Sequence, residues 1–132
     1  MRDTTVDAIA ASLADYDRVV EVGIGHRTAV ASALLAAGVA VTATDIRERS
    51  VPDGVRFVRD DVTDPALGVY DGADAVYALN CPPELHRPLA TLARRVDADC
   101  HFTTLGADPP AVPVERETLP GETLYTAKPE PI

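Results

Sequence analysis

The chain has 132 residues, of which 46% are apolar, and its formal net charge of -9 comes with only one lysine, Lys128, beside eleven arginines. This length predicts a single domain over residues 1–132, near the lower limit for a doubly wound α/β fold. No apolar run approaches the roughly 18 residues of a membrane span. Polar residues open the chain where a signal segment would be apolar, so we expect a cytoplasmic protein with no membrane partner.

The acidic surface bears on partners and on the solvent. A net charge of -9 repels nucleic acid at ordinary salt. Asp-rich, Lys-poor usage favours a halophilic source, where high ionic strength screens self-repulsion. In that setting the charge adapts the solvated surface and does not exclude an RNA partner. Cys81 and Cys100 form no CxxC pair, and the few His and Cys residues predict no metal site.

The first half of the chain alternates helical and strand patterns. Val6, Ile9, Ala10 and Leu13 form one apolar stripe at helical spacing. After it we expect, in order, a strand at 18–22, a helix at 28–37, a strand at 39–44 and a strand at 55–58.

The second half continues the alternation and then changes character. We expect a short helix at 66–70, a strand at 73–79, a helix from Pro83 to residue 96 and a strand at 100–105. Two short antiparallel strands, at 112–117 and 123–127, then flank a turn. Repeated βαβ order implies a parallel sheet with right-handed crossovers. The sequence therefore predicts an α/β fold, a three-layer Rossmann-like sandwich of strand order 3-2-1-4-5 with a short C-terminal hairpin or edge strand.

A Gly-x-Gly turn follows the first strand and opens the next helix. Gly23 and Gly25 would let a ribose or phosphate approach the backbone, with helix N–H groups left unpaired. Glu21 lies two residues before the first Gly, and Asp45 lies 20 residues after the second. The alternatives are a purely structural βα turn for the two glycines and a helix-capping or solvated loop acid for Asp45. Two acids at these distances from one turn favour contact with a nucleoside-like ligand.

These residues carry a resemblance. Glu21-Val22-Gly23-Ile24-Gly25, Asp45 and Asp60-Asp61 resemble the first three motifs of class I S-adenosylmethionine-dependent methyltransferases. The chain is also similar to a small uncharacterised archaeal family with a truncated version of that fold, over roughly residues 1 to 105. The resemblance implies a cofactor site at Glu21, Gly23, Ile24, Gly25, Asp45, Ile46, Asp60, Asp61 and Val62.

The roles implied by the resemblance differ between these residues. Glu21 would organise the glycine turn and meet the methionine amino group, and Asp45 would bind the ribose. Asp60 or Asp61 would meet the adenine amine, and Val62 would pack on the adenine face. Arg27 stands near the position of a third Gly, close to a helix N-terminus. It indicates an anionic group of cofactor or substrate nearby, or else a solvated loop residue.

The segment Asn80-Cys81-Pro82-Pro83 follows the fourth predicted strand and resembles the Asn-Pro-Pro-aromatic motif of amino-methyltransferases. The resemblance implies that Asn80 and the Pro82 carbonyl accept hydrogen bonds from a target amine. An inserted Cys and Glu84 in the aromatic position depart from the motif, and a Pro-initiated helix explains the prolines equally well. His86 is a residue type more often found at the surface than as a general base.

Three functions remain open from the sequence. The first is a methyltransferase-like protein that binds S-adenosylmethionine and acts on a small-molecule, protein or RNA substrate. The second is a non-catalytic nucleotide-binding or partner-binding module. The third is an NAD-binding Rossmann protein, which Thr28 disfavours because it occupies the third Gly position of the dinucleotide fingerprint. The exposed edge of a truncated sheet also favours a homodimer.

Overall fold

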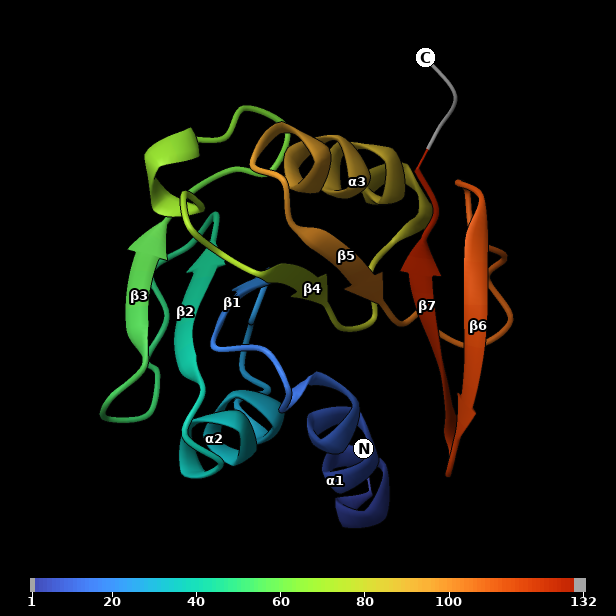
Figure 1. Ribbon diagram of the computed structural model, residues 1–132, viewed down its shortest axis with the longest axis horizontal. Helices are drawn as coiled ribbons and strands as arrows, with labels where there is room; N and C mark the ends of the chain where they lie inside the picture. Colours follow the sequence, from blue (N-terminus) through green and yellow to red (C-terminus); the bar gives the residue numbers. More distant parts are fainter. Residues whose placement is uncertain (1, 130–132) are drawn as a thin grey trace.

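A computed structural model describes residues 2–129 and places their strands in one continuous sheet (Figure 1). The sheet has seven strands in the order β3-β2-β1-β4-β5-β7-β6. The five strands from β3 to β5 are mutually parallel, and β7 pairs antiparallel with both β5 and β6. The predicted order 3-2-1-4-5 is confirmed, and the C-terminal hairpin extends the sheet beyond β5.

The elements follow the predicted alternation. In chain order they are α1 (Asp3–Leu13), β1 (Arg18–Val22), α2 (Ala29–Ala36), β2 (Ala40–Asp45), β3 (Arg56–Arg59), the 3-10 turn η1 (Leu67–Val69), β4 (Ala75–Ala78), the 3-10 turn η2 (Pro83–Leu85), α3 (His86–Arg95), β5 (Asp99–Phe102), β6 (Val114–Leu119) and β7 (Glu122–Ala127).

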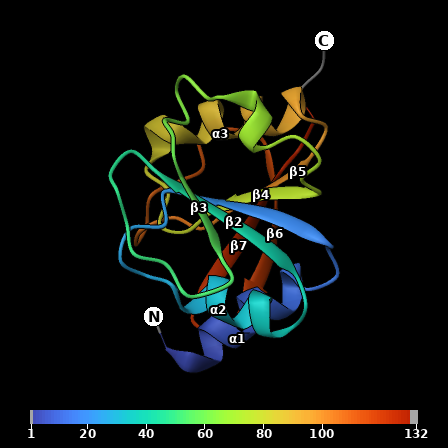
Figure 2. The same cartoon turned by 90° about the vertical axis from the view of Figure 1, so that its left-hand side faces the viewer.

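Helices cover the sheet on both faces, which confirms the three layers. Helices α1 and α2 pack on one face, and α3 packs on the other (Figures 1 and 2). Successive residues of β1 point to opposite faces, so Val19 joins the α1/α2 core whereas Val20 and Val22 join the α3 core. Each face therefore has its own buried apolar cluster.

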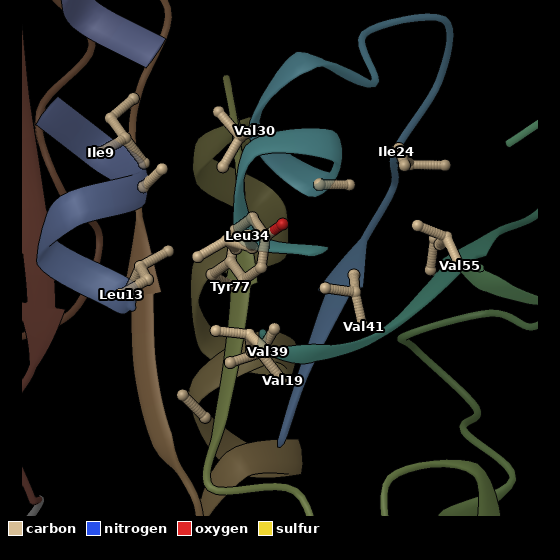
Figure 3. Close-up of a cluster of buried hydrophobic side chains, with 14 of the residues drawn as sticks. Ile9, Leu13, Val19, Ile24, Val30, Leu34, Val39, Val41, Val55 and Tyr77 are labelled. Atoms are coloured by element: carbon tan, nitrogen blue, oxygen red, sulfur yellow. The ribbon is translucent and has the colours of Figure 1, made fainter. Parts of the chain in front are cut away.

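The core under α1 and α2 fixes the sheet end that carries the glycine turn. Ile9 and Leu13 of α1 and Leu34 of α2 are fully buried, and they lie over Val19 of β1 and Tyr77 of β4 (Figure 3). Ile24, inside the glycine turn, belongs to the same cluster and is 2% exposed. The turn is thus anchored by a buried side chain at its centre.

Two segments differ locally from the prediction. The helix expected at 66–70 is only the 3-10 turn η1, because Gly68 and the flanking Pro65 and Asp71 leave no room for a full α-helical turn. The helix expected from Pro83 starts with η2 and becomes α-helical at His86.

Candidate functional site

The glycine turn lies at the carboxyl edge of the sheet, between the end of β1 at Val22 and the start of α2 at Ala29. Gly23 and Gly25 have φ of +69° and +58°, in the left-handed region that favours glycine. A Cβ at either position would meet no atom within 4 Å. The glycines are therefore required by the backbone conformation, and the space beside both is open to a ligand.

The backbone N–H groups of the glycine turn itself have protein partners. The expectation of unpaired N–H groups concerns the start of α2 at Ala29 and stays a prediction. The N–H groups of Gly23 and Ile24 both donate to the carbonyl of Thr44, at 2.9 and 3.1 Å. The N–H of Gly25 donates to Oδ2 of Asp45 at 2.9 Å. These bonds tie the turn to the end of β2. These hydrogen bonds depend on how closely the glycine turn approaches the end of β2, and the spacing of the motifs along the sequence does not predict that distance.

Glu21 lies inside the sheet, where it is 1% exposed. Its Oε1 accepts a hydrogen bond from the Tyr77 hydroxyl at 2.7 Å, on the α1/α2 side. Burial raises the pKa of Glu21 to about 8, and the hydrogen bond from Tyr77 opposes this only in part. The carboxyl is therefore largely protonated at neutral pH. Its expected contact with a ligand ammonium stays a prediction.

Asp45 ends β2 and clamps two loops together. Its Oδ2 accepts from the Gly25 N–H and lies 3.3 Å from Nε of Arg49, and its Oδ1 accepts from the Arg47 N–H at 3.0 Å. Nη1 of Arg49 also lies 3.1 Å from Nε2 of His26. Burial raises the pKa of Asp45, but the N–H groups of Arg47 and Gly25 and the charge of Arg49 outweigh it, so the pKa is lowered. Asp45 is thus ionised, and Oδ1 retains capacity for a further donor.

Ile46, the next residue of the implied cofactor site, has the opposite environment. Its side chain is 60% exposed, although its carbonyl accepts a 2.8 Å hydrogen bond from Nε of Arg59. An exposed apolar side chain beside a buried carboxylate is a surface on which a flat ring can pack.

The two acids after β3 differ in availability. Asp60 accepts hydrogen bonds from the Tyr70 hydroxyl and from the Ala66 N–H, so its carboxylate serves the η1 turn. Asp61 is exposed, and only its Oδ1 is held, by the hydroxyl and N–H of Thr63, which lower its pKa. Of the two alternatives, Asp61 has the more exposed side chain, and its contact with a ligand stays a prediction.

The segment after β4 is held in an uncommon backbone conformation. Asn80 has φ +50°, its N–H donates to Oγ1 of Thr103 at 2.8 Å, and the Cys81 N–H donates to the Thr103 carbonyl at 2.8 Å. Asn tolerates this left-handed region better than most residues. Cys81 is 4% exposed, and burial with the nearby charge of Glu84 raises the pKa of its thiol to about 12. Cys81 is therefore a packing residue, as is Cys100, which is equally buried.

Four of the predicted residues meet in one place. A cavity of about 80 Å³ lies between β1 and β4, with Gly23, Val62, Asn80 and Pro82 in its wall. Val62 is 8% exposed and supplies an apolar surface. Glu21 and Asp45 do not line this cavity. The structure thus brings the glycine turn together with the Asn80–Pro82 segment, and it leaves both carboxylates bound to protein groups.

His86 holds the Asn80–Pro82 segment through a hydrogen bond to Cys81. The prediction that His86 lies at the surface is wrong. It is fully buried and packs against Phe102, with ring centroids 4.2 Å apart and the ring planes tilted by 31°. Its Nδ1 accepts from the Ala111 N–H at 3.0 Å, so Nε2 carries the proton and donates to the Cys81 carbonyl at 2.9 Å. His86 precedes Leu89 by three positions, and this helical spacing was the signal that it faces the core.

Within residues 2–129 no group of three or more His, Cys, Asp or Glu side chains could hold a metal ion. In the same residues no helix is long and apolar enough to cross a membrane.

A family model described as "Uncharacterised protein family (UPF0146)" matches residues 3–128. The chain belongs to this family. A UPF0146 protein of Halobacterium salinarum is 56% identical over 126 residues, which cover 95% of this chain and 98% of that protein. A UPF0146 protein of Archaeoglobus fulgidus is 47% identical over 102 residues, which cover 73% and 78% of the two chains. The expected archaeal relationship is confirmed.

Solved structures with a similar fold include methyltransferases with bound cofactor. An RNA methyltransferase from Salinibacter ruber in complex with S-adenosyl-L-homocysteine has a TM-score of 0.67 at 19% identity and covers 100% of this chain and 95% of that one. Magnesium protoporphyrin IX methyltransferase from Synechocystis with bound S-adenosylmethionine has a TM-score of 0.64 at 16% identity, with 94% and 78% covered. The UPF0146 chain thus has a Rossmann-like fold of the methyltransferase type.

Proposed function

We propose that this UPF0146 protein binds S-adenosylmethionine at the carboxyl edge of its sheet and transfers its methyl group. The observation that carries the proposal is the open glycine turn: its positive-φ glycines have free space beside them, and Gly23 shares a cavity wall with Val62 and Asn80. The fold type, which similar chains use with this cofactor, supports it.

The chain's own residues fit a nucleoside cofactor at several points. The empty space at Gly23 and Gly25 admits a close approach to the backbone. Oδ1 of Asp45 has capacity for a ribose hydroxyl, exposed Ile46 and buried Val62 offer apolar surfaces to a base, and Asp61 can accept from an adenine amine. The cavity of about 80 Å³ is smaller than an adenosine, so most of the cofactor would lie over the turn and the β2 end.

The cofactor's chemistry limits what the protein has to supply. When bound, S-adenosylmethionine offers a methyl group on a sulfonium, and an acceptor's lone pair displaces the neutral thioether while the acceptor's proton passes to solvent. Asn80 and the Pro82 carbonyl would orient an acceptor amine, because both lie at the cavity wall beside the glycine turn. Methyl transfer at this site is then a matter of positioning.

Calorimetry with S-adenosylmethionine, S-adenosylhomocysteine and NAD in parallel tests the binding. We expect both adenosyl sulfur compounds to bind and NAD not to bind. Binding of NAD alone would contradict the proposal and favour a dinucleotide protein. Binding of the adenosyl compounds without methyl transfer to small amines, protein or tRNA would favour a non-catalytic module, for which the inserted Cys81 and Glu84 argue.

An Asn80→Gly variant separates catalysis from folding. Glycine adopts the +50° φ of this position readily, and the bond to Thr103 uses the backbone N–H, so we expect stability to change by less than about 0.5 kcal/mol. Binding of S-adenosylhomocysteine should persist while methyl transfer is lost. Unchanged turnover would exclude a role for the Asn80 side chain.

We also propose that the protein works in a cytoplasm of high salt. The net charge of -9, the single lysine and the Halobacterium relative support this. Screening of the acidic surface should raise the melting temperature as KCl reaches molar concentration. A melting temperature that stays flat or falls over that range would contradict a halophilic origin.

A further inference from the structure

A second, larger pocket lies beside the cavity at the same edge of the sheet. It has a volume of about 660 Å³, and four separate segments form its wall. These are the start of α1, the glycine turn, the end of β4 and the β6–β7 turn, which contribute Arg2, Thr5, Arg27, Asn80, Gly121 and Glu122. We name this the acceptor pocket.

The hairpin turn is fixed against α1, so the wall of the acceptor pocket is a built feature. The Thr5 hydroxyl donates to the Pro120 carbonyl at 2.6 Å. A Cβ at Gly121 would lie 2.6 Å from that hydroxyl oxygen, so only glycine fits at this contact. Further along, the Ser12 hydroxyl donates to Oε1 of Glu117 at 3.1 Å. The C-terminal hairpin thus supplies a wall that the methyltransferase-like core by itself does not have.

The charge of the acceptor pocket is opposite to that of the protein. Arg2 and Arg27 are exposed, and neither guanidinium has a hydrogen bond or ion pair with any residue in the range 2–129. The facing acid is Glu122, whose Oε1 accepts from the Thr123 N–H. Arg27 also lies just before α2, whose N-terminal dipole disfavours a cation unless an anion is bound. Two cations without partners face one acid, in a chain of net charge -9.

The acceptor pocket adjoins the proposed cofactor site. Asn80 lines both the acceptor pocket and the smaller cavity with Gly23. A molecule held by Arg2 and Arg27 would therefore present its far end to Asn80.

We propose that the acceptor pocket binds an anionic group, a phosphate or a carboxylate, of the molecule that receives the methyl group, with Arg2 and Arg27 as its two anchors. This assignment of substrate class rests on the proposed function. Arginine suits the role because its planar, permanently charged guanidinium matches both oxyanions in a two-point contact. The pocket then selects its substrate by charge, against the repulsion of the acidic surface around it.

The test uses inorganic phosphate and acetate as probes on the full chain. Backbone amide NMR signals around Thr5, Arg27 and Gly121 are followed in a titration with each anion. The Arg2→Gln/Arg27→Gln double variant is compared with Arg56→Gln/Arg94→Gln, an equal charge change at two exposed sites, the start of β3 and the end of α3. Calorimetry with S-adenosylhomocysteine is run on the same three proteins.

We expect saturable shifts in the wild type, at least tenfold weaker binding in the Arg2→Gln/Arg27→Gln variant, and no change in Arg56→Gln/Arg94→Gln. Stronger binding of phosphate or of acetate identifies the source of the oxyanion. Absence of saturable shifts at these amides would overturn the proposal. So would a loss of S-adenosylhomocysteine affinity in the Arg2→Gln/Arg27→Gln variant alone, because the arginines would then hold the cofactor's own carboxylate. Phosphate binding in a wild type that does not bind S-adenosylhomocysteine would retain the anion site and refute the cofactor.

Discussion

On the β1–β2 half of the carboxyl edge, both predicted carboxylates already have protein partners, whereas on the β4 half the polar groups face open space. Glu21 is paired with Tyr77, and Asp45 is held by Gly25, Arg47 and Arg49. Across the edge, Asn80 lines a pocket of about 660 Å³, into which the glycine turn contributes Arg27. The carboxylates of the first half are held by the fold itself, and the polar groups of the second half are open to the proposed ligand. Substitutions of the two carboxylates and their partners should therefore change stability, and substitutions of groups that border the open space should change binding.

The largest effect is expected from Glu21→Gln. Burial raises the pKa of Glu21 to about 8 from 4.5, so the folded chain holds a proton that the unfolded chain releases. This stabilisation is complete below pH 4.5 and is lost as the pH rises to about 8. A glutamine at position 21 can still accept the hydrogen bond from the Tyr77 hydroxyl, and it stays neutral at every pH. The variant should be more stable than wild type at pH 8 by about 2–4 kcal/mol, and the difference should shrink toward pH 5, in urea unfolding at molar KCl.

Glu115→Gln, an exposed position on β6, is the control for this series and should keep the wild-type pH dependence. If Glu21→Gln retained the wild-type dependence as well, the carboxyl would be ionised at neutral pH and the first half would be held by a charge.

Gly23→Ala and Gly38→Ala separate backbone strain from ligand contact. The two glycines have φ of +69° and +90°, and a Cβ at either meets no atom within 4 Å. Each alanine should lower the free energy of unfolding by about 1–2 kcal/mol, because an L side chain is strained in this region. Only Gly23 borders the cavity, so only Gly23→Ala should weaken S-adenosylhomocysteine binding, by tenfold or more in calorimetry. Equal affinities in the two variants would place the ligand elsewhere.

The smallest effect is expected from Arg49→Met, which removes the ion pair with Asp45. The two side chains are 20% and 7% exposed, so the loss should be about 0.5–1 kcal/mol at low salt and less at molar KCl, where screening weakens the pair. Arg47→Met is the matched control, because Arg47 holds Asp45 through its backbone N–H. Equal losses in the two variants, or a loss independent of salt, would show that the ion pair does not clamp these loops.

The strand order followed from sequence because continuous apolar runs that alternate with helical patterns admit few right-handed arrangements. The glycine turn was equally visible, since Gly23 and Gly25 stand directly between a strand and a helix. The hydrogen-bond partners of Glu21 and Asp45 could not be predicted from the sequence. Whether Asp45 faces a ligand or the Gly25 N–H depends on a loop approach of a few ångströms. His86 was misplaced because one polar residue type was weighed without its spacing to Leu89.

The sequence by itself determined the layers, the strand order and the edge that carries the glycine turn, because hydrophobic periodicity and glycine conformation act locally. Only the tertiary structure decided which polar groups are already satisfied and that the β6–β7 turn closes a pocket with Arg2 and Arg27. Those contacts join residues up to 115 positions apart, as Thr5 and Pro120 are. No local pattern records a contact that forms only when the whole sheet has assembled.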